Sequence, residues 1–445
     1  MLAAMPQPPA AASRDEPVIR ERGDACPGAL RLHAADDGFL ARVRIPGGVL
    51  TVDQAALLAR AADRFGDGHL ELTSRGNVQL RGLAEGCGAG LAELLDAAGL
   101  LPAPGHERVR NIVATPMSGD GHPGRPDVLP WVAALDRLLC ANERVTALSG
   151  RFLFAFDDGR GDVAALEPDV TVLGGGPRGR ALVRLGPAAG AVSVAAQDAP
   201  RAALLAAEYF LDAADAAGTR AWRVRELPPE HALDEAEFAA RLAAAGIGAA
   251  RVRDVAWPYS PPPRPRSGGT GPRGTLCVLS PLGRLSSEQW RVLVQVADRD
   301  RGLRITPWRS IVLPDAPLRP PAGGPARLEN AGLVVSPDSP WQSVTACTGQ
   351  PGCAKSLADV RADARAVVQR ARGPLPVHWS GCERRCGHPR GTRWVDVLAT
   401  HDGYRLSVHG QALPHRADLA AALTAARTGT PGSADSADSE DAVKK

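Results

Sequence analysis

Two stretches of the chain repeat the same order of hydrophobic and polar positions. Residues 43–83 and 278–315 each begin with an apolar strand pattern and a turn that contains Pro and Gly. In each stretch a hydroxyl residue (Thr51, Ser286) then precedes an acidic residue and apolar positions at helical spacing, which is a typical helix start. Alternating apolar and polar positions follow and predict strands. The pattern therefore predicts a β-α-β unit that occurs twice.

The segments that follow these two units also match. The matched ranges are 110–119 with 342–350, and 147–159 with 378–391. They pair Thr115 with Thr345, and Ser149 with Ser380. Because the offset between the copies stays nearly constant, we interpret the chain as a duplicated β-α-β plus α/β unit, packed about a pseudo-twofold axis. A chance likeness between two α/β segments is the alternative.

Composition marks the ends of the chain and one linker. Residues 1–23, rich in Ala and Pro, and 428–445, rich in Ser and Asp, are predicted to be disordered. The Pro-rich and then Gly-rich segment 257–274 is typical of an exposed connector. The predicted domains are a first β-α-β unit at 24–105, a first α/β lobe at 106–256 with a helical insert at 201–250, a second unit at 275–335, and a second lobe at 336–427.

The overall composition is that of a globular protein. Charged residues make up 23% and hydrophobic residues 44% of the 445 positions. A formal net charge of +3 is too small to indicate a general nucleic-acid binder. The chain has neither an apolar run of about 18 residues nor the basic start of a secretory signal. We therefore expect a soluble, cytoplasmic protein with no membrane partner.

Four of the eight cysteines form the strongest chemical signal. Their pattern is Cys347-x5-Cys353 followed by Cys382-x3-Cys386, whereas Cys26, Cys87, Cys140 and Cys277 are scattered. Two close pairs of thiolates suit a [4Fe–4S] cluster or tetrahedral zinc, and unligated thiols are the third interpretation. The five-residue gap is wider than a zinc knuckle, and the glycines beside both pairs let the backbone approach a bulky inorganic core. This pattern favours the cluster.

A second candidate site lies in the segment LTSRGNVQLRG (72–82). Arg75, Asn77, Gln79 and Arg81 alternate along it, so in a strand all four would project from one face. Two guanidinium forks and two amides on one surface suit a polycarboxylate ligand. A solvated sheet face is the alternative. Further candidates are Arg108, Arg110 and Arg309.

The segment Gly174–Gly179 satisfies a dinucleotide-binding pattern, G-x-G-x-x-G. That pattern must open a helix, yet the residues after it read as another strand. A hairpin turn is the better interpretation. We therefore predict no NADH site, and expect electrons to arrive from a separate reductase or ferredoxin.

The cysteine pattern, together with the upstream TSRGNVQLRG segment in a duplicated chain, resembles the sulfite and nitrite reductases that carry siroheme and a [4Fe–4S] cluster. The resemblance covers roughly residues 24–410. It implies an α+β fold with duplicated ferredoxin-like half-domains and two α/β lobes related by a pseudo-twofold. It also implies that Cys347, Cys353, Cys382 and Cys386 ligate the cluster. Cys386 would be the candidate bridge to a second iron or to siroheme.

Within that superfamily the chain resembles most the precorrin-3B synthases, the monooxygenases of cobalamin biosynthesis. The likeness rests on the opening ACPGALRLHAADDGFLARVRIPGG together with LELTSRGNVQLRGL. The reductases hold their small oxyanion with a K-x-K lysine pair, and here Arg151 and Leu153 stand in its place. Sulfite and nitrite need concentrated positive charge, so loss of the second cation favours the monooxygenase.

The resemblance implies oxidation of precorrin-3A by O2, with ring hydroxylation and lactone formation. The implied cofactors are the [4Fe–4S] cluster and a mononuclear non-haem iron, whose ligands the sequence does not indicate. His122, His378 and His388 lie near the cluster segments, but a lone histidine is more often structural. Residues predicted to contact the tetrapyrrole are Arg75, Asn77, Gln79, Arg81, Arg110, Arg151 and Arg309.

Two other functions stay open. One is a siroheme-dependent nitrite or sulfite reductase linked to ferredoxin or NAD(P)H, in which the macrocycle is a bound cofactor and not a substrate. The other is a non-catalytic iron–sulfur redox protein. Metal analysis and redox titration distinguish that protein from either enzyme.

Overall fold

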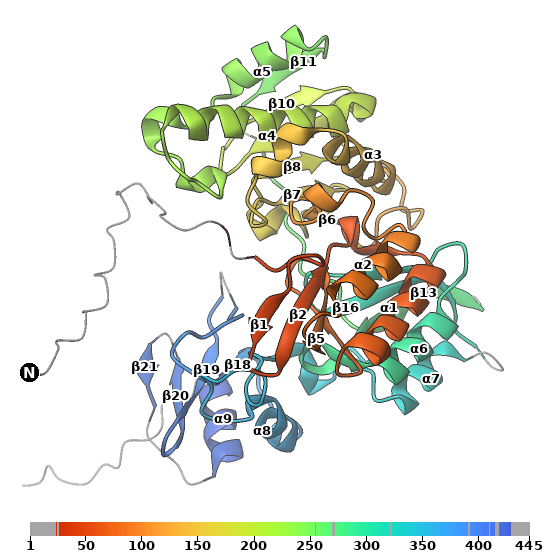
Figure 1. Ribbon diagram of the computed structural model, residues 1–445, viewed down its shortest axis with the longest axis vertical. Coiled ribbons are helices and arrows are strands. Elements are labelled where there is room, and N and C mark those ends of the chain that lie inside the picture. Colours follow the sequence, from red (N-terminus) through yellow and green to blue (C-terminus); the bar gives the residue numbers. More distant parts are fainter. Residues whose placement is uncertain are drawn as a thin grey trace, which may run out of the picture.

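The structure is a computed structural model that describes residues 24, 26–253, 255–268, 272–319, 323–389, 392–408, 410–413 and 418–428. The predicted disordered segments, 1–23 and 428–445, lie outside the described residues, except for Thr428 at the end of α9 (Leu419–Thr428). Four sheets organise the chain (Figure 1). Two belong to the β-α-β units, and the other two belong to the lobes.

The first unit is a five-stranded sheet that packs against α1 (Val52–Phe65) and α2 (Gly88–Ala97). Its strand order is β1 (His33–Ala35), β2 (Gly38–Val43), β5 (Val78–Leu83), β4 (His69–Leu72) and β14 (Arg284–Ser286). The second unit packs in the same way against α6 (Ser287–Val296) and α7 (Gly324–Asn330). Its order is β12 (Arg266–Gly268), β13 (Arg273–Leu279), β16 (Ser310–Pro317), β15 (Leu303–Ile305) and β3 (Val49–Leu50).

The two units exchange a strand reciprocally. Strand β14 from the second unit completes the first sheet beside β4, and β3 from the first unit completes the second sheet beside β15. Helices α1 and α6 pack together, and Trp290 Nε1 donates to Ala55 O at 2.7 Å in the shared core. This reciprocity confirms the predicted duplicated ferredoxin-like half-domains and their pseudo-twofold relation.

Local sequence explains why the two central helices begin where they do. Thr51 caps α1 and Ser286 caps α6, each by accepting a hydrogen bond from the backbone N–H of a glutamine three residues later. The side chains of those glutamines, Gln54 and Gln289, return a contact to the capping residue. A capping box satisfies two backbone N–H groups that a helix start leaves free.

The first lobe is a six-stranded sheet. Its order is β11 (Ala249–Val252), β10 (Ala191–Val194), β9 (Ala181–Leu185), β8 (Val170–Leu173), β7 (Phe154–Asp157) and β6 (Ile112–Ala114). Its helices are α3 (Leu129–Cys140), α4 (Ala199–Ala216) and α5 (Glu235–Ala244). Strands β6, β7 and β8 are parallel, and the rest of the sheet is antiparallel.

The second lobe repeats this topology in five strands. Its order is β17 (Val344–Ala346), β18 (Val377–Ser380), β19 (Val395–Thr400), β20 (Gly403–Val408) and β21 (Gln411–Ala412). Its helices are α8 (Val360–Val367) and α9. The first three strands are again parallel and the last two pairings antiparallel. We call it the cysteine lobe, because Cys347, Cys353, Cys382 and Cys386 all belong to it.

Short 3-10 helices connect these elements. They are η1 (Pro46–Gly48), η2 (Pro104–His106), η3 (Glu143–Ala147), η4 (Ala164–Leu166), η5 (Pro177–Gly179), η6 (Ala196–Asp198), η7 (Val224–Glu226), η8 (Pro229–His231), η9 (Pro281–Gly283) and η10 (Pro340–Ser343). Within the part of the chain that the structure describes, no helix is both long and apolar enough to cross a membrane.

Three segments refine the sequence interpretation. The insert 201–250 contains most of α4 and all of α5, but it ends in the edge strand β11, which pairs with β10. The connector 257–274 contains the edge strand β12. The Gly174–Gly179 segment links the antiparallel strands β8 and β9, so it is the hairpin turn that the sequence predicted.

The alignment of the two lobes needs correction. Thr115 N donates to Phe156 O across β6 and β7, and Cys347 N donates to Trp379 O across β17 and β18. Thr115 is therefore the structural counterpart of Cys347, and not of Thr345. By the same pairing Ser380 corresponds to Asp157 and not to Ser149. Aligning identical residue types of the two lobes gave the wrong register, because the segments between their strands differ in length.

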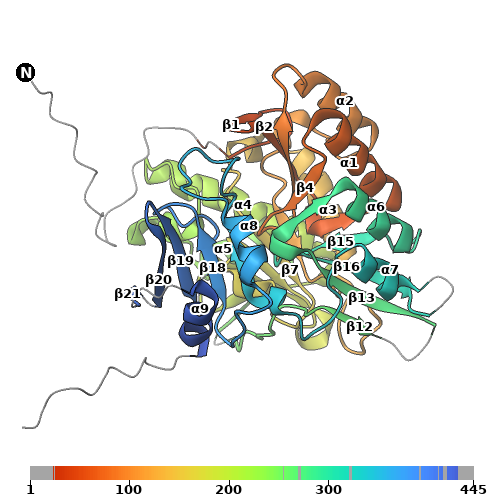
Figure 2. The ribbon, with the colours of Figure 1, turned by 90° about the horizontal axis from the view of Figure 1, so that it is seen from below.

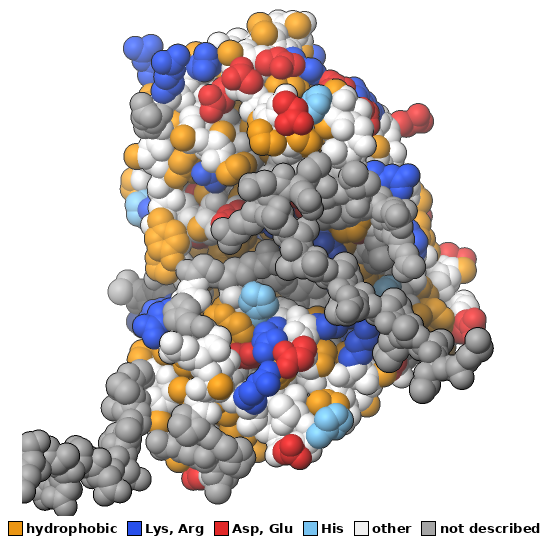
Figure 3. Space-filling model, turned by 90° about the vertical axis from the view of Figure 1, so that its left-hand side faces the viewer, with side chains coloured by type: hydrophobic (Ala, Val, Ile, Leu, Met, Phe, Trp, Pro, Cys, Tyr) orange, Lys and Arg blue, Asp and Glu red, His pale blue; other side chains and the backbone are white. Residues whose placement is uncertain are grey.

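Figures 1 and 2 show how the parts lie in space. The two half-domains lie side by side, the first lobe extends from one side of them, and the cysteine lobe lies beside the β1–β2 edge. On the face drawn in Figure 3, basic and acidic side chains are interspersed and do not gather into an extended patch of one sign.

Candidate functional site

Two neighbouring parallel strands carry the first cysteines of the two pairs. Cys347 directly follows β17, and Cys382 lies two residues after the end of β18. The N–H of Gly381 donates to Cys347 Sγ at 3.2 Å, so the two strand ends are joined at the sulfur. Gly381 has no room for a side chain, because an added Cβ would lie 1.9 Å from Ser356 Oγ. The Cys-bearing loops therefore pack at close backbone range.

The other two cysteines lie in loops fixed through their carbonyls. Cys353 O accepts from Ser356 N at 2.9 Å. Cys386 O accepts from Nε2 of the buried His378 at 3.1 Å. All four thiols are free, and Cys386 is the exposed one among them.

The donor set fits an iron–sulfur cluster in its chemistry. Burial raises the pKa of Cys347, and the Gly381 and Gly349 N–H groups oppose this, while Cys386 and Cys382 raise it further by charge repulsion. The charges of Cys382 and Cys386 thus act on the Cys347 thiol. No three His, Cys, Asp or Glu side chains among the described residues lie close enough to hold a single metal ion. A cubane differs from such a site because it distributes its four thiolates over four irons.

The nearby histidines are engaged elsewhere. His378 contacts Thr345 Oγ1 through Nδ1 at 2.8 Å, in addition to Cys386 O through Nε2. Burial, and next the charge of Arg309, lower the pKa of His378 to about 3, so it is neutral. His388 stacks on Trp394, and the exposed His122 contacts Pro123 O through Nδ1. His378 therefore positions the Cys386 loop, with neither ring nitrogen free for an iron.

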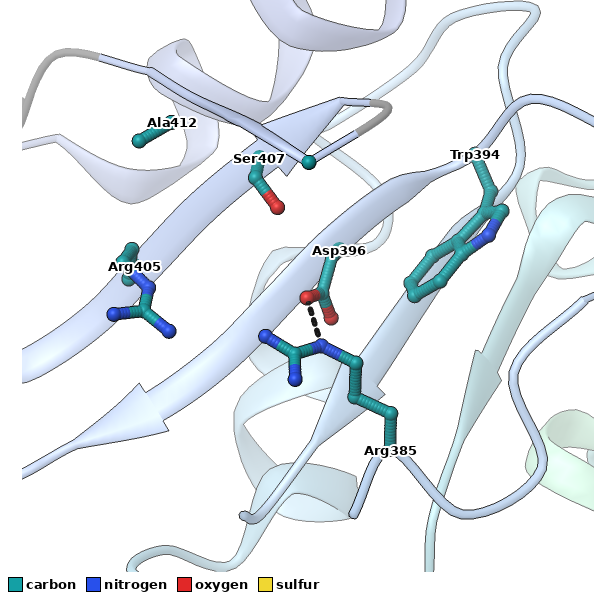
Figure 4. Close-up of a pocket in the computed structure, with 7 residues that line it drawn as sticks. Arg385, Trp394, Asp396, Arg405, Ser407 and Ala412 are labelled. Atoms are coloured by element: carbon teal, nitrogen blue, oxygen red, sulfur yellow. Dashed lines mark hydrogen bonds and ion pairs between the residues drawn. The ribbon is translucent and has the colours of Figure 1, made fainter. Parts of the chain in front are cut away.

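A cavity of about 380 Å³ lies on the outer side of the cysteine lobe (Figure 4). Arg385 and Asp396, which form an ion pair at 2.6 Å, line this cavity together with Trp394. Trp394 also meets the ring of His378 edge-on at 5.8 Å. This cavity thus adjoins the residues that position Cys386.

The β1–β2 turn of the first half-domain contacts the loop that carries Cys353. Asp36 accepts from Ala354 N, and Asp37 forms an ion pair with Arg81 at 2.7 Å. Arg81 Nη2 also donates to Gly352 O at 2.7 Å. The residues on both sides of Cys353 are therefore held by the first half-domain.

A second connection runs through a residue that the sequence did not single out. Arg361 of α8 pairs with Glu71 of β4 at 2.5 Å, and its Nε donates to Cys347 O at 3.2 Å. Arg361 lies in an amphipathic helix with no local motif, so only the tertiary contact shows its role.

Only Gln79 and Arg81 of the predicted polar strand face at residues 72–82 lie in a strand, and the polar side chains of this segment contact other parts of the protein. Strand β5 begins at Val78, so Arg75 and Asn77 lie in the preceding turn, where Gly76 has a φ of +66°. Asn77 is 2% exposed and its Oδ1 accepts from Ile45 N at 2.9 Å. Gln79 accepts from Arg42 Nη2 at 2.9 Å. Asn77 and Gln79 are buried, so for these two side chains the alternative of a solvated sheet face is ruled out.

Two predicted arginines have structural partners. Arg110 makes a bidentate contact with Asp136 at 2.7 and 2.8 Å, and its Nη1 donates to Leu100 O. Each guanidinium nitrogen of Arg110 thus has a protein partner, and the side chain supports α3 through Asp136. Arg151 is exposed and lies over the ring of Trp222 at 4.6 Å.

Leu153 is buried among apolar side chains. It is 4% exposed and packs in an apolar cluster with Val113, Ala155 and Val163. A lysine there would place an ammonium group among hydrocarbon side chains. The site therefore has no cation at this position.

Arg309 reaches from the second half-domain to the cysteine lobe. Its φ is +60°, and its Nη2 lies 3.1 Å from where a side chain on Gly387 would begin. Nη1 is buried without a hydrogen-bond partner. Burial, and next the charge of Arg361, lower the pKa of Arg309. A buried guanidinium nitrogen without a partner suits an anionic ligand.

Strand β2 contributes arginines that the sequence analysis missed. Arg42 and Arg44 lie at its end, on the same face as Gln79. Arg42 Nε is buried without a partner. Burial, and next the charges of Arg42 and Arg75, lower the pKa of Arg44 to about 9. The alternation in ARVR is the signal that could have identified them.

Asp24 lies against this group of arginines. Its carboxylate accepts from Ser149 Oγ at 2.8 Å and from Gly150 N at 2.7 Å. Arg75 Nη1 donates to Gly150 O at 3.0 Å. The junction of the first half-domain and the first lobe is thus a basic surface that already accommodates one carboxylate.

Comparison with known proteins agrees with this architecture. The family model described as "Nitrite/Sulfite reductase ferredoxin-like half domain" matches residues 32–98 and 268–319, one segment in each half-domain. The fold is also similar to the solved structure of the Mycobacterium tuberculosis NirA protein, with a TM-score of 0.65 and 18% identity over 87% of this chain and 79% of that one. The chain is thus similar to nitrite and sulfite reductases in its half-domains and in its fold.

Two curated relatives narrow the comparison. A precorrin-3B synthase from Sinorhizobium sp is 26% identical over 414 residues, which span 89% of this chain and 84% of that protein. A ferredoxin–nitrite reductase from Synechococcus elongatus is 26% identical over 393 residues, 79% of this chain and 74% of that protein. Both likenesses extend well beyond the half-domains.

Proposed function

We propose that the chain is an iron–sulfur monooxygenase of the precorrin-3B synthase type, which oxidises precorrin-3A with O2 in aerobic cobalamin biosynthesis. The observation that carries the proposal is Leu153, whose side chain is buried where the reductases that the chain resembles present a second lysine. A compact oxyanion lacks its second cation here. A large polycarboxylate can instead use the dispersed arginines where the half-domains meet the lobes.

Cys347, Cys353, Cys382 and Cys386 would hold the [4Fe–4S] cluster, which passes one electron at a time. Gly381 N–H already donates to Cys347 Sγ, and hydrogen bonds to cluster sulfur raise a reduction potential. Cys386 is the candidate for a bridge to a second iron or to a macrocycle, because it is the exposed member of the set.

Arg42, Arg75 and Arg309 would bind the acetate and propionate groups of the substrate. Arg42 and Arg309 each have a buried nitrogen without a partner, and Arg75 lies at the basic junction with the first lobe. Asn77, Gln79 and Arg81 are committed to protein contacts, so their role is to hold this surface and the Cys353 loop in place.

The reaction balances with two external electrons. One oxygen atom of O2 enters the ring as a hydroxyl group, and a neighbouring acetate closes the lactone. The second oxygen atom leaves as water after uptake of two electrons and two protons. A separate reductase or ferredoxin supplies the electrons.

A siroheme-dependent nitrite reductase is the second candidate. It is favoured by the ferredoxin–nitrite reductase relative, whose match covers 79% of this chain. The two functions differ in the role of the macrocycle. In the reductase it is a permanently bound cofactor, and in the monooxygenase it is a substrate that binds anew for each turnover.

The test is a spectrum with iron and sulfide analysis of anaerobically purified protein, followed by turnover. Precorrin-3A, heavy-oxygen-labelled O2 and a reductant are supplied, and the product mass is measured. Incorporation of one labelled atom supports the proposal. An extractable siroheme with nitrite consumption would establish the second candidate. A cluster with neither activity would indicate a redox protein.

A matched pair of variants tests the substrate assignment. Arg309→Gln removes a guanidinium that faces the cysteine lobe, whereas Arg327→Gln removes an exposed one from α7. We expect KM for precorrin-3A to rise about tenfold in Arg309→Gln, as for loss of one charge-assisted hydrogen bond, with iron content unchanged. Equal KM values in the two variants would contradict the assignment.

A further inference from the structure

A second cavity lies away from the cysteines, between the first lobe and the second half-domain. Its volume is about 470 Å³, within the range of small-molecule sites. Pro116 and Met117, which follow β6, form one wall. Arg304 of β15 and Val312 of β16 form the other.

Arg304 lines this cavity, and its buried guanidinium group is not fully hydrogen-bonded. It is 5% exposed, and its Nη1 donates to Pro116 O and Ser118 O, both at 2.6 Å. Its Nε is buried and has no hydrogen-bond partner. Burial, and next the charge of Arg301, lower the pKa of Arg304 to about 10. Burying an incompletely bonded guanidinium is costly unless an anion completes its contacts.

The carboxylates of the cavity do not supply that anion. Asp120 pairs with Arg160 at 3.1 Å, and Asp315 pairs with Arg273 at 3.0 Å. Arg301, which is exposed at the rim, donates to Gly119 O at 2.8 Å. Across the described ranges, neither Arg301 nor Arg304 forms an ion pair with a carboxylate.

The pseudo-twofold relates Arg304 in this cavity to a residue at the junction with the cysteine lobe. Thr73 and Thr306 make the same turn contacts, so Arg304 occupies the position that Glu71 has in the first half-domain. Glu71 meets Arg361 of the cysteine lobe. Arg304 instead meets only backbone carbonyls of the first lobe. The junction with the first lobe thus has a cation, Arg304, where the junction with the cysteine lobe has the carboxylate Glu71, and among the described residues this cation has no carboxylate partner.

We propose that this cavity binds a small organic anion. A carboxylate or phosphate group pairs with Arg301 and with the guanidinium of Arg304, both of which line the cavity. The hydrocarbon part of the ligand packs on Met117 and Pro314. The site is independent of the monooxygenase activity proposed above.

The experiment measures thermal stabilisation of the full-length holoprotein by acetate, propionate, butyrate and inorganic phosphate. Sodium chloride at equal ionic strength is the reference. A ligand that binds only the folded state raises Tm in a saturable way. We expect the affinity to rise by up to about fourfold per methylene along the carboxylate series, which corresponds to about 0.8 kcal/mol. If phosphate binds more tightly than butyrate, the natural ligand is a phosphate and not a carboxylate.

Variants locate the binding. We expect Arg301→Gln to weaken binding about tenfold, the loss of one charge-assisted contact, and Arg304→Gln to abolish it. Arg301 is exposed, so its variant should fold even if Arg304→Gln does not. Arg299→Gln removes an exposed charge from the same loop and should bind as the wild type does.

Two outcomes would overturn the proposal. One is a Tm that responds to the anions no more than to chloride. The other is stabilisation that survives in Arg301→Gln but disappears in Arg75→Gln, which would place the anion at the basic junction of the main cleft. Iron and sulfide content is measured on every variant, so that cluster loss is not mistaken for loss of anion binding.

Discussion

The two lobes have one topology and opposite chemistry at the same strand ends. In the cysteine lobe, Gly381 N donates to Cys347 Sγ at 3.2 Å. In the first lobe the equivalent bond runs from Asp158 N to Thr115 Oγ1 at 3.3 Å. A hydroxyl thus replaces the thiol within an almost unchanged backbone. Duplication preserved the frame and changed the side chains that it presents.

In the first lobe, carboxylates at the end of β7 and in the loop after it accept hydrogen bonds from that loop and from Thr115. Asp157 accepts from three backbone N–H groups, those of Gly159, Gly161 and Ala164. Asp162 accepts from Thr115 Oγ1 at 2.8 Å. The corresponding loop of the other lobe instead carries Cys382. The comparison shows that the first lobe satisfies its strand ends internally, while the cysteine lobe offers thiols for a cluster.

The largest effect is expected at the cysteines. Cys382→Ser should remove most iron and sulfide and abolish turnover, because a neutral hydroxyl is a poor iron ligand. Cys140→Ser, in α3 of the first lobe, is the control and should keep full iron content. Iron, sulfide and activity assays give the result. Full iron content in Cys382→Ser would refute the cluster assignment.

The next effect compares two aromatic residues at equivalent positions. Phe156 and Trp379 are 0% and 1% exposed, and truncating either to Ala should cost about 3–5 kcal/mol of unfolding free energy. Only Trp379→Ala should also lose iron, because Trp379 lies beside Cys347 in the parallel register. Denaturant unfolding and iron analysis check this. Equal iron loss in both variants would show that the lobes are coupled.

A smaller effect distinguishes the lobes by pH. Burial, and next the charge of Asp157, raise the pKa of Asp162 to about 7, and Asp158 adds to the rise. Between the unfolded pKa near 3.8 and about 7, the folded state holds a proton that the unfolded state has lost, so stability falls as pH rises. Asp162→Asn should remove this dependence, gaining up to about 2–3 kcal/mol over the wild type between pH 5 and pH 8. Unfolding curves at both pH values test it, and an unchanged gap would contradict the assignment.

The smallest effect concerns the half-domains, where the copies remain alike. Thr51→Ala and Ser286→Ala each remove a capping box and should each cost about 1 kcal/mol. Chemical denaturation measures both. A large difference between the two would show that the half-domains no longer share equivalent helix starts.

The sequence predicted the repeat well because its signals are local. Capping residues, apolar periodicity and the turn at Thr73 and Thr306 all act over a few residues, and the structure confirms them. The lobe alignment was less accurate, because hydrogen bonds between strands, and not similar letters, fix the pairing of Thr115 with Cys347. Arg361 could not be found, since its partner Glu71 is 290 residues away.

By itself, the sequence determined the duplicated α+β architecture and the two cysteine pairs, because periodicity and spacing are properties of the chain. Only the tertiary structure decided which polar side chains are free. Arg75, Gln79, Arg81 and Arg110 look alike as candidates in sequence. The fold gives Arg110 a carboxylate partner and leaves nitrogens of Arg42, Arg304 and Arg309 without one. A side chain's availability depends on which distant groups reach it, and long-range packing sets that.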